Sequence, residues 1–183
     1  MADDAQLEVR RRTSALPATA IREGRDRDAE AIASIRNHEI AHTTATWSTT
    51  RMTAEAVTLW LEAKREAEIP VIAAGDPLQG FATWGPFRHG EGYAGVAEHS
   101  VYVGAAHRGL GLGTALLTAL IDRARAAGLR HLVGGIDAGQ MASLALHRRQ
   151  GFVEVGRLPE IGMKFGQPRT LVLMQHALAE GRP

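Results

Sequence analysis

Residues that can cradle a phosphate lie in the middle of this chain. The segment Val103–Thr114 runs from an expected strand into an expected helix. Near its end it carries Arg108 and three glycines at alternate positions, Gly109, Gly111 and Gly113. Glycine lets backbone N–H groups approach an anion closely, and the first turn of a helix adds unpaired donors and its positive dipole end. The segment therefore predicts a site for a phosphorylated cofactor.

The spacing of these residues excludes two common nucleotide-binding motifs. The fingerprint G-x-G-x-x-G fails because Thr114 stands where its third glycine is needed, and the tripeptide G-K-[ST] occurs nowhere in the chain. What remains is Arg108-x-x-Gly111-x-Gly113 at the start of a helix. A glycine-rich turn before a surface helix, without any ligand, is the alternative that this motif alone leaves open.

This arrangement resembles the R/Q-x-x-G-x-G/A signature of the GCN5-related N-acetyltransferases (GNAT), which hold the pyrophosphate of acetyl-CoA at that place. The resemblance implies acetyl-CoA as the cofactor. It also implies the residues that contact this cofactor: Val101, Tyr102, Val103, Arg108, Gly109, Leu110, Gly111, Leu112, Gly113, Thr114, Gln140, Ser143 and His147.

Glu98 is placed to act as a base, five residues before this strand ends. Alternation along the strand puts three side chains on each face, Glu98, Ser100 and Tyr102 on one, and His99, Val101 and Val103 on the other. Partial desolvation would raise the pKa of a carboxylate here toward the range useful for taking a proton from an ammonium group. A solvated carboxylate, or one paired with an arginine, is the alternative.

The segment from Ser143 to Phe152 resembles the family's closing segment, S-x-x-L-[YH]-x-x-x-G-F. In many GNAT enzymes an aromatic hydroxyl at that place protonates the departing thiolate, and His147 occupies it here. His147 could act as this acid or only contact the cofactor, and a lone helical histidine is more often structural.

The resemblance spans 21–178 and becomes more specific in four segments, 35–38, 43–47, 85–103 and 162–166, which look like the phosphinothricin and methionine sulfoximine N-acetyltransferase branch. Such enzymes acetylate the α-amine of small glutamate-like or methionine-derived amino acids and are commonly homodimers. The resemblance implies Glu98 as the base for direct attack, and a substrate pocket with Thr44, Trp47, Phe87, Arg88, Tyr93 and Glu98.

Departures from that branch concentrate on the acceptor side. Ala94 and Val96 replace an arginine and a threonine, Gln167–Thr170 replaces R-W-L-D, and Gln140 replaces an asparagine that commonly contacts pantetheine. The acceptor therefore stays open between a small amino acid and another amine, such as a polyamine, an antibiotic or a peptide. A non-catalytic acyl-CoA-binding module is a further alternative, against which the presence of Glu98 argues.

A competing motif lies near the N-terminus, where 38–42 reads H-E-I-A-H and matches the zinc motif H-E-x-x-H. A zinc protease needs this helix to continue and a third ligand to follow, whereas 43–46, Thr-Thr-Ala-Thr, disfavours helix and no H-x-x-G-x-x-H extension occurs. We therefore expect exposed or pocket-lining histidines and no metal.

The composition indicates an ordinary globular protein. The 183 residues are 45% hydrophobic, and 21 Lys and Arg against 20 Asp and Glu produce no field that would attract nucleic acid or a membrane surface. No apolar run approaches the roughly 20 residues of a membrane span. The absence of cysteine excludes disulfides, zinc–thiolate sites and a thiol nucleophile. We expect a cytoplasmic protein that acts on a small-molecule amine.

The elements that must position these residues can be read from hydrophobic periodicity and turn signals. Strands are expected over 19–22, 69–74, 78–84, 93–103, 132–136, 153–158 and 170–175, and helices over 26–42, 53–67, 111–127 and 140–150. This order predicts an α/β protein with a mixed sheet and helices on both faces. The family resemblance implies the GNAT fold, in which the sheet is mostly antiparallel. One domain is expected over 18–179, between a disordered N-terminal tail, 1–17, and a short C-terminal tail, 180–183.

Overall fold

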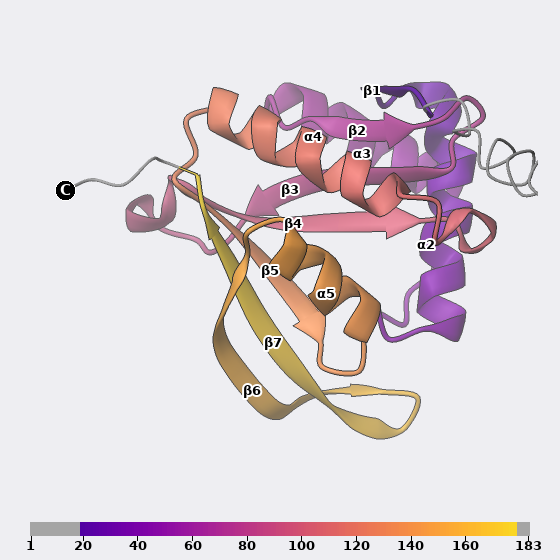
Figure 1. Ribbon diagram of the computed structural model, residues 1–183. Coiled ribbons are helices and arrows are strands. Elements are labelled where there is room, and N and C mark those ends of the chain that lie inside the picture. Colours follow the sequence, from indigo (N-terminus) through magenta and orange to yellow (C-terminus); the bar gives the residue numbers. More distant parts are fainter. Residues whose placement is uncertain (1–18, 179–183) are drawn as a thin grey trace, which may run out of the picture.

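Seven strands form one mixed sheet in the order β1-β2-β3-β4-β5-β7-β6 (Figure 1). They are β1 (Ile21–Glu23), β2 (Val71–Ala74), β3 (Gly80–Pro86), β4 (Val96–Val103), β5 (His131–Asp137), β6 (Val153–Lys164) and β7 (Gln167–Ala177). The computed structural model describes residues 19–178, so both predicted tails lie outside the described residues. Among the described strands only β4 and β5 pair in parallel, which confirms the mixed, mostly antiparallel sheet.

Helices cover both faces of this sheet, as predicted. A 3-10 turn, η1 (Asp26–Asp28), leads into α2 (Ala29–His42), which shares one face with α3 (Ala54–Glu66), while α4 (Leu112–Ala126) and α5 (Met141–Arg149) share the other (Figure 1). Two further 3-10 turns are η2 (Glu91–Tyr93) and η3 (Ala105–His107). No helix within 19–178 is long and apolar enough to cross a bilayer.

The two hydrophobic cores follow from the two-residue period of the strands. In β2, Val71 and Ala73 pack with α2 and α3, whereas Ile72 and Ala74 pack with α4. The same alternation in β4 turns Tyr102 toward the first core and its neighbours toward the second, as the sequence predicted. Neighbouring residues of one strand therefore serve different layers of the molecule.

β4 and β5 separate in the middle of the sheet. Their register pairs Val96 with His131, Ala97 with Leu132 and, last, Glu98 with Val133. Both strands continue beyond this last pair, β4 to Val103 and β5 to Asp137, and they diverge (Figure 1). The divergence opens the sheet directly after Glu98, on the side where the glycine-rich turn begins.

Some predicted boundaries were wrong. Tyr93 belongs to η2, and the strand begins only at Val96. The two last strands are much longer than expected, since β6 continues to Lys164 and β7 begins at Gln167. Two irregularities in the pairing of these strands accommodate the glycines and proline in β6, which weaken the strand signal.

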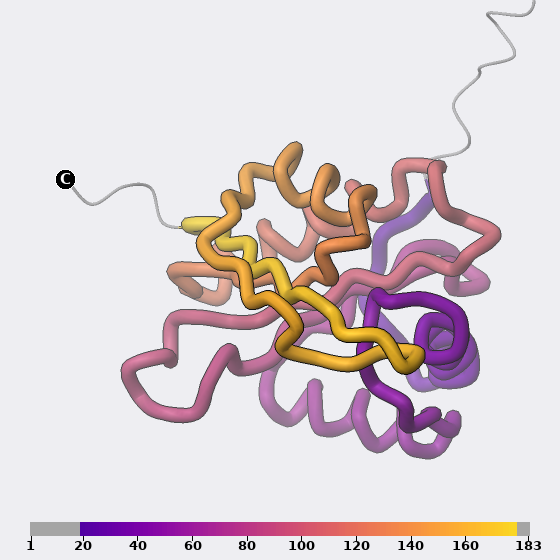
Figure 2. Tube along the Cα trace, turned by 90° about the horizontal axis from the view of Figure 1, so that it is seen from below, coloured from indigo at the N-terminus to yellow at the C-terminus, as the bar shows by residue number. Residues whose placement is uncertain are grey.

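The β6–β7 hairpin reaches back to the segment that follows α2 (Figure 2). The buried ammonium of Lys164 donates hydrogen bonds of 2.7 Å to the carbonyl oxygens of Ile40 and Ser48. Gly162 is also required at this contact, because a Cβ there would overlap the ring of Trp47. The hairpin therefore fixes the loop that carries Trp47.

Candidate active site

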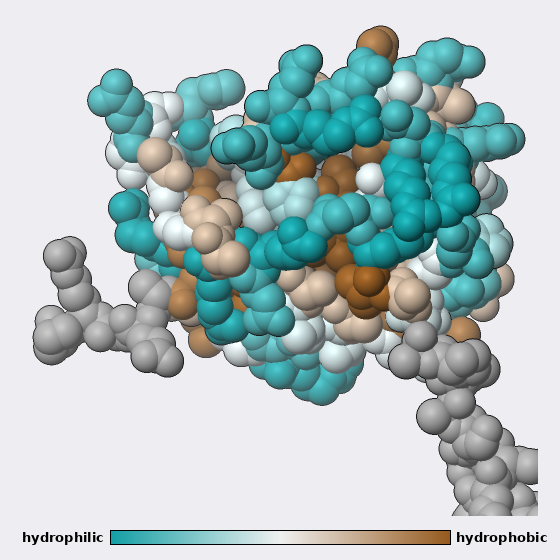
Figure 3. Space-filling model, turned by 90° about the horizontal axis from the view of Figure 1, so that it is seen from above, coloured by the Kyte–Doolittle hydropathy of each residue, from teal (hydrophilic) through white to brown (hydrophobic). Residues whose placement is uncertain are grey.

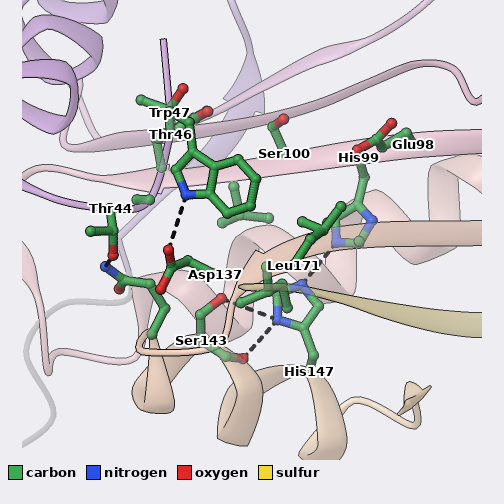
Figure 4. Close-up of a pocket in the computed structure, with 17 residues that line it drawn as sticks. Thr44, Thr46, Trp47, Glu98, His99, Ser100, Asp137, Ser143, His147 and Leu171 are labelled. Carbon is green, nitrogen blue, oxygen red and sulfur yellow. Dashed lines mark hydrogen bonds between the residues drawn. The ribbon is translucent and has the colours of Figure 1, made fainter. Parts of the chain in front are cut away.

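A cavity of about 280 Å³, called here the Glu98 cavity, lies where β4 and β5 separate (Figure 4). Its walls come from the loop after α2, from β4 beyond Ala97, from the end of β5 and from the start of α5. The side chains seen in it are largely polar and include Thr44, Trp47, Glu98, Ser100, Asp137 and His147. Elements distant in sequence thus converge on the gap in the sheet.

A second cavity of about 520 Å³, called here the cradle cavity, lies between the glycine-rich turn and α5. The two cavities share six lining residues, Ala45, Val101, Tyr102, Gln140, Ser143 and His147. They therefore meet along the part of β4 that follows Glu98. A ligand in the cradle cavity can reach the Glu98 cavity from there.

The glycines have the conformations that an anion cradle requires. Gly109 and Gly111 have φ values of 76° and 82°, in the left-handed region that favours glycine, and Gly111 is the N-cap of α4. A Cβ on Gly113 would lie 3.2 Å from Leu146 Cδ2, so Gly113 lets α5 pack closely. The first turn of α4 lines the cavity with its free N–H groups, which fits a phosphate.

The residues predicted to contact the cofactor line the cradle cavity with one exception. Leu110 is 52% exposed and lies outside the lining. Sequence reasoning did not select six other lining residues, Glu39, Ala45, His107, Ala142, Leu146 and Arg149. Arg149 adds a positive charge near the glycine-rich turn. Sequence reasoning could not select it, because α5 ends in two adjacent arginines and their order alone does not tell which one faces the cavity.

Glu39 takes a different role from the one that H-E-x-x-H suggests. His38 and His42 are exposed, whereas Glu39 is buried and accepts hydrogen bonds from Arg108 and, at 2.7 Å, from the hydroxyl of Thr43. A signal for its burial was present in the sequence, since Glu39 lies seven residues after buried Ile32 and shares its helix face.

Glu98 lines its cavity with a partly desolvated carboxyl group, although the residue as a whole is exposed. Burial raises the pKa of this carboxyl, and the positive charge of Arg88 opposes the rise. A Cβ on Gly135 would lie 3.0 Å from Glu98 Oε1, so glycine at this position of β5 leaves room for the carboxylate. A carboxylate in this state is suited to accept a proton.

His99 and His147 form a buried pair in the lining of the Glu98 cavity (Figure 4). Their Nε2 atoms are 2.9 Å apart, His99 Nδ1 lies 2.9 Å from the carbonyl oxygen of Val133, and His147 Nδ1 lies 2.7 Å from that of Ser143. Phe152 packs against both rings. Burial lowers the pKa of both histidines, and each charge would also oppose the other.

A hydrogen-bonded cluster closes the cavity opposite Glu98. The carboxylate of Asp137, only 1% exposed, accepts two hydrogen bonds from Arg169, at 2.5 and 2.7 Å, and one of 3.0 Å from Trp47 Nε1. Burial by itself would raise the pKa of Asp137, but these bonds and one from the N–H of Gly139 hold it below its usual range. Trp47 is thereby locked over the cavity.

The predicted acceptor residues fall into two groups. Thr44, Trp47 and Glu98 line the Glu98 cavity, and Gln140 Nε2 donates a hydrogen bond of 2.9 Å to the Thr44 hydroxyl. Phe87, Arg88 and Tyr93 do not line it. Arg88 and Tyr93 line a separate cavity that Trp84 also lines, and the ring of Tyr93 lies 6.0 Å from that of Phe87.

Comparisons with known proteins show which family the chain belongs to. The model of the acetyltransferase (GNAT) family matches residues 32–152. The chain is 41% identical over 159 residues to an L-methionine sulfoximine/L-methionine sulfone acetyltransferase of Pseudomonas paraeruginosa, covering 85% of this chain and 92% of that protein.

Two solved structures share the fold. A Salmonella typhimurium acetyltransferase with its cofactor acetyl-CoA has a TM-score of 0.87 and 36% identity, over 90% of this chain and 96% of that one. A GNAT superfamily phosphinothricin acetyltransferase from Sinorhizobium meliloti, in complex with acetyl-CoA, has a TM-score of 0.86 and 29% identity, over 90% of both chains.

Proposed function

Because this chain belongs to the acetyltransferase (GNAT) family and uses acetyl-CoA as its cosubstrate, we propose that it acetylates the α-amine of a small amino acid or analogue, with Glu98 as the general base. The observation that carries the proposal is the position of Glu98. Its carboxyl, with a raised pKa, lies in a small polar cavity that joins the cradle cavity.

The chemistry follows from this arrangement. Glu98 takes a proton from the substrate ammonium, and the neutral amine then attacks the acetyl carbonyl from the Glu98 cavity. The C–N bond forms, the nitrogen loses its second proton to solvent, the C–S bond breaks, and the departing sulfur needs a proton. His147 lines both cavities and is the proposed source of that proton.

The acceptor class is supported by the size of the cavity and by the similar proteins. A volume of about 280 Å³ suits a small molecule better than a peptide. Similar proteins are named for methionine sulfoximine, methionine sulfone and phosphinothricin. The departures at Ala94 and Val96 lie outside the lining of this cavity, and within 167–170 Arg169 holds the lining residue Asp137 in place, which favours an acceptor of the same class.

The test is Glu98→Gln, with Glu62→Gln on the exposed face of α3 as a control that removes the same charge elsewhere. We expect Glu98→Gln to lower turnover by roughly 10²–10⁴ and to leave acetyl-CoA affinity nearly unchanged, because only the proton transfer is lost. Turnover equal to that of the control would remove Glu98 from the mechanism.

Thiol release in a screen of amines identifies the acceptor. Phosphinothricin, methionine sulfoximine, methionine sulfone and natural amino acids form one panel, and polyamines and short peptides form the other. Turnover only in the second panel contradicts the proposed acceptor class. Acetyl-CoA binding without turnover in either panel supports the non-catalytic module instead.

We also propose that the protein is a homodimer formed through the β6–β7 hairpin. Six apolar side chains on β6 and its turn are 41–61% exposed: Val153, Val155, Leu158, Ile161, Met163 and Phe165. The opposite side of the molecule is mostly hydrophilic (Figure 3). An apolar row along an edge strand favours pairing with a second copy. Light scattering should give a dimer for the unsubstituted protein and a monomer for Ile161→Lys, and a monomer in both would overturn the proposal.

A further inference from the structure

The buried pair of His99 and His147 makes three contacts that each require a proton. Carbonyl oxygens only accept hydrogen bonds, so His99 Nδ1 must carry a proton to bond Val133, and His147 Nδ1 must carry one to bond Ser143. The two Nε2 atoms, 2.9 Å apart, need a third proton between them, since two lone pairs at that distance repel.

Neutral rings cannot supply three protons. A neutral imidazole carries one N–H, so the neutral pair has two protons for three contacts, and a third proton makes the pair cationic. Burial opposes that charge and lowers the pKa of both histidines. When neutral, the pair therefore lacks one of the three protons that its contacts require. A negative charge that develops in the adjoining cavity favours uptake of this third proton.

The charged groups around the pair are few among the described residues. His176 of β7 lies beyond Phe152, and its charge would oppose protonation of His99. On the cavity side, β4 carries Glu98 and β5 carries Asp137, whose carboxylate is already bonded to Arg169. On α5, Arg149 lines only the cradle cavity.

We propose that His99 and His147 share one exchangeable proton, and that His99 is the positioning residue that lets His147 act as the acid. The inference rests on the proposed acetyl transfer. The step begins from the pair with three protons: as the thiolate departs, the N–H bond at His147 Nδ1 breaks and an S–H bond forms, while the proton between the two Nε2 atoms moves onto His147, which leaves both rings neutral. The pair then regains one proton from solvent. Because the substrate nitrogen loses two protons in becoming an amide and sulfur gains one, each turnover releases one proton.

Ser143 favours rapid reprotonation of the neutral state that follows, because its carbonyl oxygen lies 2.7 Å from the bare His147 Nδ1 and two lone pairs at that distance repel. Its hydroxyl lies 3.5 Å from His147 Nδ1 and can donate to that atom once the proton has left. Gly134 provides space for the pair, because a Cβ there would lie 2.9 Å from His99 Cε1 and 3.5 Å from His147 Nε2. Both features belong to the local packing of β5 and α5.

The first test is NMR of the ligand-free protein with ¹⁵N-labelled histidines. We expect one proton bound between the two Nε2 atoms, visible through its coupling to nitrogens of both residues, and ¹⁵N shifts of both rings that change together on titration. A spectrum in which neither Nε2 carries a proton, or in which each ring titrates alone, overturns the proposal. This measurement does not depend on the acceptor.

The second test is His99→Gln, with exposed His38→Gln as the control. The amide of the introduced glutamine can donate to or accept from His147 Nε2 but cannot pass a proton to it, so His147 cannot regain through Nε2 the proton that it gives up at Nδ1. We expect kcat to fall by roughly 10²–10⁴, with KM for acetyl-CoA unchanged and loss of the limb in the pH profile of kcat that reports the acid. A purely structural role predicts a lower melting temperature with that limb retained, and this result overturns the proposal.

The two tests separate this inference from the proposed function. If the unsubstituted protein acetylates no amine, the proposed function fails, while the NMR result still decides whether the proton is shared. If turnover is found and His99→Gln retains both kcat and the pH profile, the proton-sharing role fails and the proposed function stands.

Discussion

The buried carboxylate of Glu39 accepts a hydrogen bond from the guanidinium of Arg108, which is the first residue of the cradle motif. Glu39 also accepts from Thr43, which ends α2 and begins the loop that carries Trp47. One carboxylate thus fixes both the cradle and the loop over the Glu98 cavity.

The exposures of these two side chains, 3% for Glu39 and 46% for Arg108, predict an asymmetric response to mutation. Arg108→Gln leaves a buried carboxylate without its cation, and we expect it to lower the free energy of unfolding by about 3 kcal/mol. Glu39→Gln leaves a solvated guanidinium and should cost less. The double variant should be more stable than Arg108→Gln alone, as measured by urea denaturation. If the losses of unfolding free energy in the two single variants simply add in the double variant, the two side chains are not coupled and the prediction is wrong.

Gly135 is expected to control catalysis with little effect on stability. A Cβ at this position would lie 3.0 Å from Glu98 Oε1 and would displace the carboxylate, whose side chain can move. Gly135→Ala should therefore lower kcat/KM by about tenfold or more and change stability by less than about 1 kcal/mol. At Gly156 a Cβ meets only ordinary contacts of 3.8 Å or more, so Gly156→Ala is the matched control. Equal kcat/KM in both variants would contradict the expected position of the base.

The pH dependence of kcat/KM should respond to Arg88. Burial raises the pKa of Glu98 and the charge of Arg88 lowers it, so Arg88→Gln should raise this pKa further. Because a base must be deprotonated to act, the acidic limb of the profile should move to higher pH. Arg27→Gln, at an exposed position, is the control. Since salt screens exposed charges, the shift should shrink at high ionic strength, and an unshifted limb at low salt would contradict the assignment.

Arg169→Met should destabilise the protein most at neutral pH. Asp137 has a folded-state pKa below its usual value, so its ionised form stabilises the fold above the unfolded pKa, and this contribution is lost as pH falls through the folded pKa. Without Arg169, a buried carboxylate stays unpaired, at a cost of about 3 kcal/mol or more at pH 7. The difference from the unsubstituted protein should narrow below pH 4. Removal of the exposed Arg157, paired with Glu154, should cost at most about 1 kcal/mol.

Local patterns in the sequence predicted much of the fold and part of the site. Alternation along β4 assigned Glu98 and His99 to opposite faces, and glycine spacing marked the start of α4. Both are properties of neighbouring residues, so they can be read from one segment at a time. The family resemblance added the cofactor that fits this turn.

The remaining features depend on contacts between distant segments. His99 meets His147 across 48 positions, and Arg108 meets Glu39 across 69, and neither pair leaves a local pattern. The same limit applies to Arg88, which the sequence placed in the acceptor pocket and which the structure places beside another cavity. Sheet order and the angle of the β6–β7 hairpin decide these contacts.

The separation of β4 and β5 after Glu98 and Val133 leaves the inner edge of β4 without a neighbouring strand in the described chain. We expect amide groups in the arm of a bound cosubstrate to pair with this edge of β4, so that binding would extend the hydrogen bonding of the sheet. The thermal stability of the protein then reports how much of it has the cosubstrate bound. At a concentration one hundred times Kd, binding to the folded state alone adds about 2.7 kcal/mol. The protein without bound acetyl-CoA should therefore unfold, and be degraded, sooner than the protein with acetyl-CoA bound.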